Sequence, residues 1–195
     1  SILFDLKGKP VFSSQKEFTQ YFPKSGWVEH NPEEIWRTTL KTLKNVIQKV
    51  KRLRGEILSI GITNQRETTV LWDKKTGKPV YKAIVWQDRR QEEFCKKLRK
   101  QNKDTMIFNK TGLLIDSYFS ATKIKWILDN VPKARQLMNK KQLLFGTIDS
   151  FLIWKLTKGK KHLTEATNAS RTMLFNINTN KWDKNILKKL KIPSK

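Results

Sequence analysis

The chain has 195 residues and a formal charge of +24, from 41 Lys and Arg against 17 Asp and Glu. Its length suits one domain with a hydrophobic core. No apolar run approaches the roughly 18 residues of a membrane span, and no signal peptide pattern is present. Cys95 is the single cysteine, which excludes an internal disulfide and favours a reducing, cytoplasmic compartment. Two His beside one Cys give no zinc-ligand spacing, so we predict no metal site.

The strong positive charge has two interpretations. It is typical of proteins that bind nucleic acids or anionic surfaces. It also results from a lysine-biased composition, and here Lys outnumbers Arg and the basic residues run from Lys7 to Lys195. No helix-turn-helix, zinc finger or aromatic-basic sheet motif accompanies the charge. We therefore favour the compositional interpretation and predict no specific nucleic-acid partner.

The chain begins with a predicted hairpin. Residues 1–6 have a strand pattern, residues 7–10 carry a Gly-Lys-Pro turn signal, and a second strand starts at Val11 and continues toward Phe18. The first residue is not Met, and the sequence starts inside this hairpin. We therefore expect the chain to be a fragment of a longer protein.

A long helix is predicted next, followed by more strands. Asn31 is a capping residue, Pro32 suits the first helical position, and the two acids that follow oppose the helix dipole. Apolar residues at spacings of three and four predict one buried face, made of Trp36, Leu40, Leu43, Ile47 and Val50. Residues 56–62 are predicted as a strand. Residues 68–72 and 80–86 are predicted to form a hairpin around the turn at 75–78.

The second half alternates helices with a short strand. From about residue 89 the periodicity is helical, with one helix marked by Phe94 and Leu98 and another by residues 124–131. A short strand covers residues 143–145, and Asp149 is expected to cap a helix that ends near Gly159. A last helix is predicted over residues 182–190. Strands followed by mixed helices and strands predict an α/β domain.

The polar run over residues 61–69 is the first candidate for chemistry. It includes Arg66 and Glu67 and lies between two apolar stretches. Burying unpaired polar or charged groups is costly, so such a cluster usually meets a ligand or water. A forked donor beside an acceptor suits a small, uncharged, hydroxyl-rich molecule. A structural ion pair between these two residues is the alternative, and their spacing alone does not exclude it.

Further candidates lie near residues 86, 118 and 171. Trp86 precedes a polar run and could pack against the carbon skeleton of a ligand, although a single aromatic residue is also common in a core. Tyr118 could offer its hydroxyl, or it could be structural. Arg171, in a second polar run, could hold an acid within a structural turn. No phosphate-cradling Gly-rich loop and no Ser-His-Asp arrangement is visible.

Several segments together resemble the FGGY family of carbohydrate kinases, and within it the glycerol kinases. They are residues 18–23, 26–30, 32–36, 61–69, 84–90, 143–147 and 167–172. The stretch from Tyr118 through Lys123 to Asn130 is similar to the first signature of the family. The runs Asn-Gln-Arg-Glu-Thr over 64–68 and Trp-Gln-Asp-Arg-Arg over 86–90 are those that resemble glycerol-specific members. The same family also contains kinases for other polyols and sugars, which stay an alternative.

The resemblance implies a fold, a reaction and four binding residues. The fold is the actin-like, or ribonuclease H-like, ATPase domain. The reaction is transfer of the γ-phosphoryl group of ATP, with Mg²⁺, to glycerol, which gives sn-glycerol 3-phosphate in glycerol catabolism. Arg66 and Glu67 are implied to bind the hydroxyls of glycerol, Trp86 to line its carbons, and Tyr118 to add a hydroxyl contact. Homo-oligomers are compatible with the resemblance.

The resemblance also implies what this sequence does not contain. The phosphate loop of the family would precede residue 1, and its catalytic Asp and second domain would follow residue 195. We therefore expect residues 1–195 to be one incomplete N-terminal domain, truncated at both ends. With no catalytic residue of its own, this chain is expected to be inactive alone.

Overall fold

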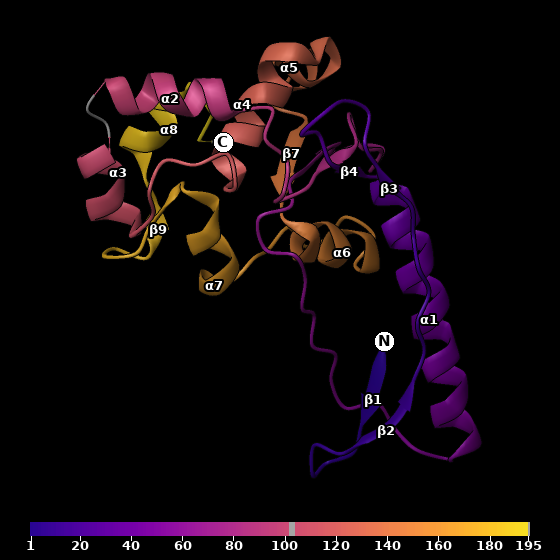
Figure 1. Cartoon of the computed structure of the whole chain (residues 1–195). Helices are drawn as coiled ribbons and strands as arrows, with labels where there is room; N and C mark the ends of the chain where they lie inside the picture. The colour runs from indigo at the N-terminus through magenta and orange to yellow at the C-terminus, as the bar shows by residue number, and fades with distance from the viewer. Residues whose placement is uncertain (102–103, 195) are drawn as a thin grey trace.

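The structure is a computed structural model that describes residues 1–101 and 104–194. Its fold is α/β, as expected from the order of the predicted elements. An N-terminal arm of one hairpin and one long helix extends away from a body that holds most of the helices (Figure 1). The strands are β1 (Ile2–Phe4), β2 (Pro10–Ser13), β3 (Gln20–Tyr21), β4 (Glu29–His30), β5 (Val70–Asp73), β6 (Ala83–Ile84), β7 (Leu143–Gly146), β8 (Phe175–Asn176) and β9 (Lys181–Trp182). The helices are α1 (Pro32–Arg52), α2 (Glu92–Lys100), α3 (Asp104–Thr111), α4 (Ser120–Asn130), α5 (Pro132–Asn139), α6 (Ile148–Leu156), α7 (Ala166–Ala169), the 3₁₀ helix η1 (Ser170–Thr172) and α8 (Lys184–Leu190).

The N-terminal hairpin forms as predicted, although its second strand is shorter. β1 and β2 pair antiparallel, with Ile2 opposite Ser13. Gly8 has a φ of +77°, which glycine adopts without steric cost, and the Asp5 carboxylate accepts bonds of 2.9 Å from the backbone N–H groups of Lys7 and Lys9. β2 ends at Ser13 and does not reach Phe18.

Helix α1 begins where the sequence predicts it. The Asn31 side chain accepts a hydrogen bond of 3.0 Å from the backbone N–H of Glu33 and caps the helix. The predicted face is half-buried, and of its members only Val50 is fully buried. The most buried positions lie on a slightly rotated face, at Pro32, Ile35, Thr42, Val46 and Val50. The rotation follows from the neighbours of the helix, since Ile35 packs into a core cluster and Thr42 contacts the hairpin.

The predicted strand over residues 56–62 is wrong. These residues form no strand or helix, and Leu58 and Ile60 are exposed at 71% and 60%. In Figure 1 the segment is a long irregular connection between α1 and the body. A strand needs a neighbour for its backbone N–H and C=O groups. None of the strands in the described part of the chain pairs with this segment.

The small sheets bring together segments that are far apart in sequence. β5 pairs antiparallel with β7, with Val70 opposite Gly146. β6 pairs with β4. The predicted hairpin of residues 68–72 and 80–86 is present in a weaker form, as bridges from Thr69 to Ile84 and from Trp72 to Pro79.

Two apolar clusters form the core. The larger one joins β5, β6 and most helices of the body, and includes Ile124, Ile127 and Leu128 on α4 as the periodicity predicts. The smaller one lies between α1, β5 and α6, where Trp72 and Phe151 meet edge to face at 5.4 Å. Both clusters contact β5, so the residues just before β5 are held on a rigid support.

Two helix predictions need correction, and two helices were not predicted. The cap position of α6 is Thr147, and Asp149 lies inside the first turn, where its carboxylate accepts bonds from the side chains of Asn64, Thr147 and Thr164. The last helix begins at Lys184, because Asp183 caps it. α3 and α5 have no counterpart among the predicted elements. Within the described residues, no helix is long and apolar enough to cross a bilayer.

Candidate functional site

Glu67 lies in a turn directly before β5, and its side chain is buried. Its backbone carbonyl accepts hydrogen bonds of 3.2 Å from the hydroxyls of Thr69 and Ser120. Its carboxylate oxygen Oε1 accepts a bond of 2.7 Å from Nε of Arg171. The second oxygen, Oε2, accepts no bond from the described residues. Glu67 is therefore fixed through its backbone and one oxygen, with the other oxygen free to accept.

Arg66 adjoins Glu67 but does not pair with it. Its side chain is exposed, and its guanidinium makes no hydrogen bond or ion pair within residues 1–101 and 104–194. The alternative of a structural ion pair between Arg66 and Glu67 is therefore wrong for this structure. The acid pairs with Arg171, which lies 104 positions further along the chain.

Trp86 and Tyr118 come together from different loops. Their ring centroids are 5.5 Å apart, and both side chains are half-buried. Tyr118 also meets Phe119 edge to face at 5.2 Å. The hydroxyl of Tyr118 makes no hydrogen bond within the described part of the chain. The pair offers an apolar ring surface with one polar group at its edge, as amphipathic aromatic residues do at binding sites.

The loop that carries Trp86 is anchored by a buried charge network. Arg90 donates bonds of 2.8 Å from Nη2 to Glu29 and Asp88, and each of these three side chains is at most 4% exposed. The Arg90 guanidinium also lies 3.8 Å from the centroid of Trp27 and 4.5 Å from that of Trp126. A buried charge is tolerated only when it is paired and hydrogen-bonded. This network therefore fixes the loop after β6 in one conformation.

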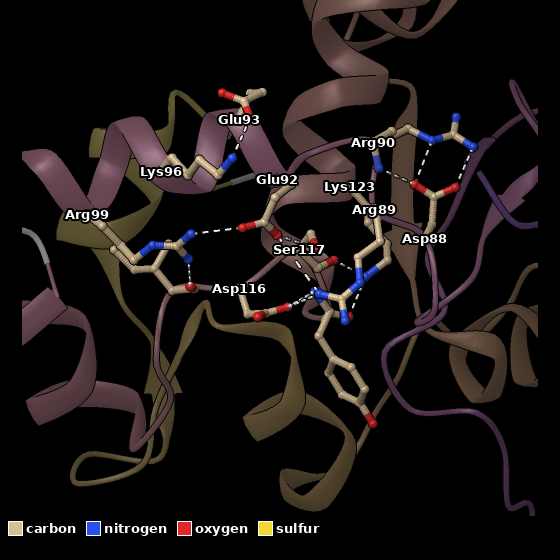
Figure 2. A network of polar contacts seen from close by, with 12 residues as sticks. Asp88, Arg89, Arg90, Glu92, Glu93, Lys96, Arg99, Asp116, Ser117 and Lys123 are labelled. Carbon is tan, nitrogen blue, oxygen red and sulfur yellow. Dashed lines mark hydrogen bonds and ion pairs between the residues drawn. The ribbon is translucent and has the colours of Figure 1, made fainter. Parts of the chain in front are cut away.

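The loop that carries Tyr118 is held by Lys123. The side chain of Lys123 is buried in α4, and its ammonium donates to the backbone carbonyls of Ser117, Tyr118 and Phe119. Figure 2 shows Lys123 beside Ser117, and Asp116 of the same loop next to Arg89, which comes from the loop before α2. Burial lowers the pKa of Lys123 to about 7.

The four predicted residues are thus only partly brought together. Arg171 connects Glu67 to Tyr118, since its guanidinium carbon lies 5.7 Å from the Tyr118 ring centroid, and Tyr118 in turn meets Trp86. Arg66 adjoins Glu67 in sequence, but its guanidinium makes no hydrogen bond to the other three residues. The polar run around Arg171 predicts a base able to hold an acid, but it does not predict which acid. The anchoring role of Lys123 was not predicted, and a lysine amid the apolar residues of α4 was its only signal.

The structure also has a cavity of about 520 Å³. It is lined mainly by apolar residues of β7, α4 and α8, and it includes none of Glu67, Trp86 or Tyr118. The lining of this cavity includes no carboxylate, in contrast to the Glu67 region. We therefore place the candidate site at Glu67.

The described residues do not fit a metal–nucleotide complex. No group of three or more His, Cys, Asp or Glu side chains in residues 1–101 and 104–194 is arranged to hold a metal ion. The sequence contains no glycine-rich phosphate loop. The chemistry that this site supports is recognition of a small polar molecule.

Comparison with known proteins places the relatives of this chain among the carbohydrate kinases. The model of the FGGY family of carbohydrate kinases, N-terminal domain, matches residues 1–195. The glycerol kinase of Malacoplasma penetrans is 60% identical over 193 residues, which are 99% of this chain and 38% of that protein. The glycerol kinase of Lactobacillus acidophilus is 57% identical over 195 residues, 100% of this chain and 39% of that protein. The chain thus spans less than half the length of these curated relatives.

Solved structures agree with the sequence comparison. The crystal structure of Plasmodium falciparum glycerol kinase with ADP has a TM-score of 0.92 and 39% identity, and covers 97% of this chain and 38% of that one. A xylulose kinase of Lactobacillus acidophilus has a TM-score of 0.84 at 24% identity, with 99% and 37% covered, and so supports the fold alone. The family match over the whole length confirms the resemblance seen in the sequence. The chain belongs to the FGGY family of carbohydrate kinases and corresponds to the N-terminal domain of that family.

Proposed function

We propose that this chain is the glycerol-recognising part of a glycerol kinase. The enzyme would transfer the γ-phosphoryl group of ATP, with Mg²⁺, to glycerol, giving sn-glycerol 3-phosphate in cytoplasmic glycerol catabolism. The relatives of 57% and 60% identity that are named glycerol kinase support this assignment. The similar structure of Plasmodium falciparum glycerol kinase with ADP supports it as well.

The observation that carries the proposal is the free oxygen of a buried carboxylate whose partner, Arg171, also contacts the ring of Tyr118, which packs against Trp86. In the proposed complex, Glu67 accepts hydrogen bonds from glycerol hydroxyls and Arg66 donates to them. Trp86 packs along the carbons, and the free hydroxyl of Tyr118 adds a further bond. Directed donors and acceptors reject an analogue that lacks a hydroxyl far better than apolar contacts do, because the site groups would stay unpaired.

The described residues include no cluster of three or more metal-ligating side chains, so we derive no phosphoryl-transfer step from them. Their part in the proposed reaction is to bind and orient the acceptor alcohol. Orientation of a reactant contributes a large share of the rate in transfers of this kind. We also propose that residues 1–195, taken as one N-terminal domain, form no glycerol 3-phosphate by themselves.

A kinase for another polyol or sugar is the second candidate. The xylulose and gluconate kinases that share the fold at 24% identity keep this candidate in place. The arrangement of an exposed Arg66 beside a buried Glu67 does not by itself distinguish glycerol from other polyols. Glycerol is favoured because residues 64–68 resemble those of glycerol-specific members.

A substrate comparison tests the proposal. The gene product that contains this chain is purified and kcat/KM is measured with ATP and each of glycerol, xylulose and gluconate. We expect glycerol to be preferred by at least tenfold. A preference for xylulose or gluconate would contradict the glycerol assignment and support the second candidate.

A further inference from the structure

The polar run that contains Arg171 has no role among the four predicted binding residues. We propose that Arg171 is a positioning residue of the glycerol site, which sets the orientation of the Glu67 carboxylate and of the Tyr118 ring. This inference rests on the proposed function for the identity of the ligand. It adds a residue that acts through another and does not itself touch the alcohol.

The contact between Arg171 and Glu67 is specific in geometry. Nε of Arg171 donates to Oε1 of Glu67 at 2.7 Å, and the side chains are 29% and 5% exposed. A charge-assisted bond of this length is among the stronger hydrogen bonds in proteins. Because it uses a single carboxylate oxygen, it stops rotation of the carboxylate while leaving Oε2 available to a ligand.

Arg171 also contacts the aromatic side of the site. Its guanidinium carbon lies 5.7 Å from the ring centroid of Tyr118 and 5.1 Å from that of Phe119. A guanidinium over an aromatic face is attracted by the ring, and its planar shape suits such stacking. One side chain therefore connects the residue before β5 with the loop before α4.

The segment that carries Arg171 is itself well supported. Glu165 caps α7, accepting bonds of 2.7 Å from the backbone N–H groups of Thr167 and Asn168. Thr172 donates a bond of 2.6 Å to the carbonyl of Ala169 and is buried. Met173 follows with a φ of +62° and is completely buried. These contacts fix the backbone on both sides of Arg171, so its side chain starts from a defined position.

Loss of this side chain has a predictable consequence. Glu67 would be left buried without its positive partner, and its carboxylate would be free to rotate. This rotation weakens the acceptor that the polyol hydroxyls need. Loss of the Arg171 side chain should therefore weaken ligand binding more than it lowers turnover. It should do so only through Glu67.

The test is a double-mutant cycle in the gene product that contains this chain. The variants are Arg171→Gln, Arg171→Lys, Glu67→Gln and the double variant Arg171→Gln with Glu67→Gln. We measure kcat, glycerol KM and the thermal midpoint. Arg171→Gln should raise KM at least tenfold with a change of less than threefold in kcat, and Arg171→Lys should restore part of the affinity. In the Glu67→Gln background, Arg171→Gln should change KM by less than twofold.

Lys110→Gln is the matched control. It removes a pair of similar burial, Lys110 with Asp183 at 2.9 Å and exposures of 24% and 7%. Since this pair lies outside the site, the control should lower the thermal midpoint and leave KM unchanged. The inference is overturned if Arg171→Gln leaves KM within twofold, or raises it by the same factor in both Glu67 backgrounds. If the wild type prefers another polyol or sugar, the proposed function fails, and the same cycle with that substrate still tests Arg171.

Discussion

Arg66 and Glu67 are neighbours in sequence but have opposite environments. Glu67 is 4% exposed and paired, whereas Arg66 is exposed and makes no bond within the described residues. A buried acid is held by the fold, but an exposed arginine without a partner is not needed for folding. Arg66 is therefore the residue whose loss should report on ligand binding alone.

We predict that Arg66→Ala in the gene product raises the glycerol KM by about tenfold or more, as expected for the loss of a hydrogen bond from a charged group. The thermal midpoint should not change. The control is Arg52→Ala, an exposed arginine in the last turn of α1. Steady-state kinetics that show the same KM in wild type and Arg66→Ala would remove Arg66 from the site.

Lys123 makes the stability of the chain depend on pH. Burial is the main cause of its lowered pKa of about 7, against an ordinary value of 10.5, and nearby Asp88, Glu67 and Asp116 oppose the shift. Between these values the unfolded state binds more protons than the folded state, so stability rises with pH. Burial of Cys95 raises its pKa from 9.0 to about 12, which lowers stability above pH 9. The rise is therefore expected between pH 7 and pH 9.

Urea unfolding at pH 7, 8 and 9 checks this. The free energy of unfolding should increase with pH, by at most about 1.4 kcal/mol per unit for a single group. Lys123→Met should remove this increase with pH, whatever the absolute stability of the variant. An equal slope in both proteins would show that Lys123 does not titrate in this range.

At the scale of elements, the turn between β5 and β6 combines backbone conformation with close packing. Gly77 has a φ of +68°, and a Cβ added there would lie 2.6 Å from Cη2 of Trp154. Gly8 has a similar φ of +77°, but an added Cβ would meet nothing within 4 Å. The two glycines therefore share a backbone requirement and differ in packing.

We predict that Gly8→Ala lowers the free energy of unfolding by about 1–2 kcal/mol, from the left-handed conformation alone. Gly77→Ala should lower it by about 1–3 kcal/mol more, because the Trp154 ring must move. Urea denaturation of both variants measures the difference. Equal losses would mean that Trp154 does not restrict this turn.

Local signals predicted the elements whose cause is local. The Asn31 cap, the periodic apolar residues of α4 and the turn at Gly8 depend on residues close in sequence, and the structure confirms them. The strand over 56–62 failed because its formation depends on a partner strand. The cap at Asp149 failed because that carboxylate is used by side chains far along the chain, such as Asn64.

The site was predictable to a similar degree. Family resemblance pointed to Glu67, Trp86 and Tyr118. In the structure Glu67 and Tyr118 both contact the Arg171 side chain, and Trp86 packs against Tyr118. The partner of Glu67 could not be predicted, because the pairing with Arg171 depends on how the α7–η1 segment packs. The anchoring of the Tyr118 loop by Lys123 is a local contact, between residues four to six positions apart, but no spacing rule reveals that this lysine turns inward.

At the scale of the whole molecule, the charge of +24 raises the question of nucleic-acid binding. Such binding rests on neutralised phosphates and falls steeply with salt. We predict only weak association of the chain with generic duplex DNA at physiological salt, with a dissociation constant above about 1 µM. Fluorescence anisotropy across a salt series measures this. Submicromolar binding with a steep salt slope would contradict the compositional interpretation of the charge.

The central claim is that the surface around Glu67 binds glycerol. A crystal structure of the gene product, grown without other polyols and soaked with glycerol near its KM, tests it most directly. We expect glycerol with a hydroxyl within hydrogen-bond distance of Oε2 of Glu67, a second hydroxyl at Arg66, and its carbons against Trp86. Glycerol bound elsewhere, with this surface holding only water, would contradict the claim.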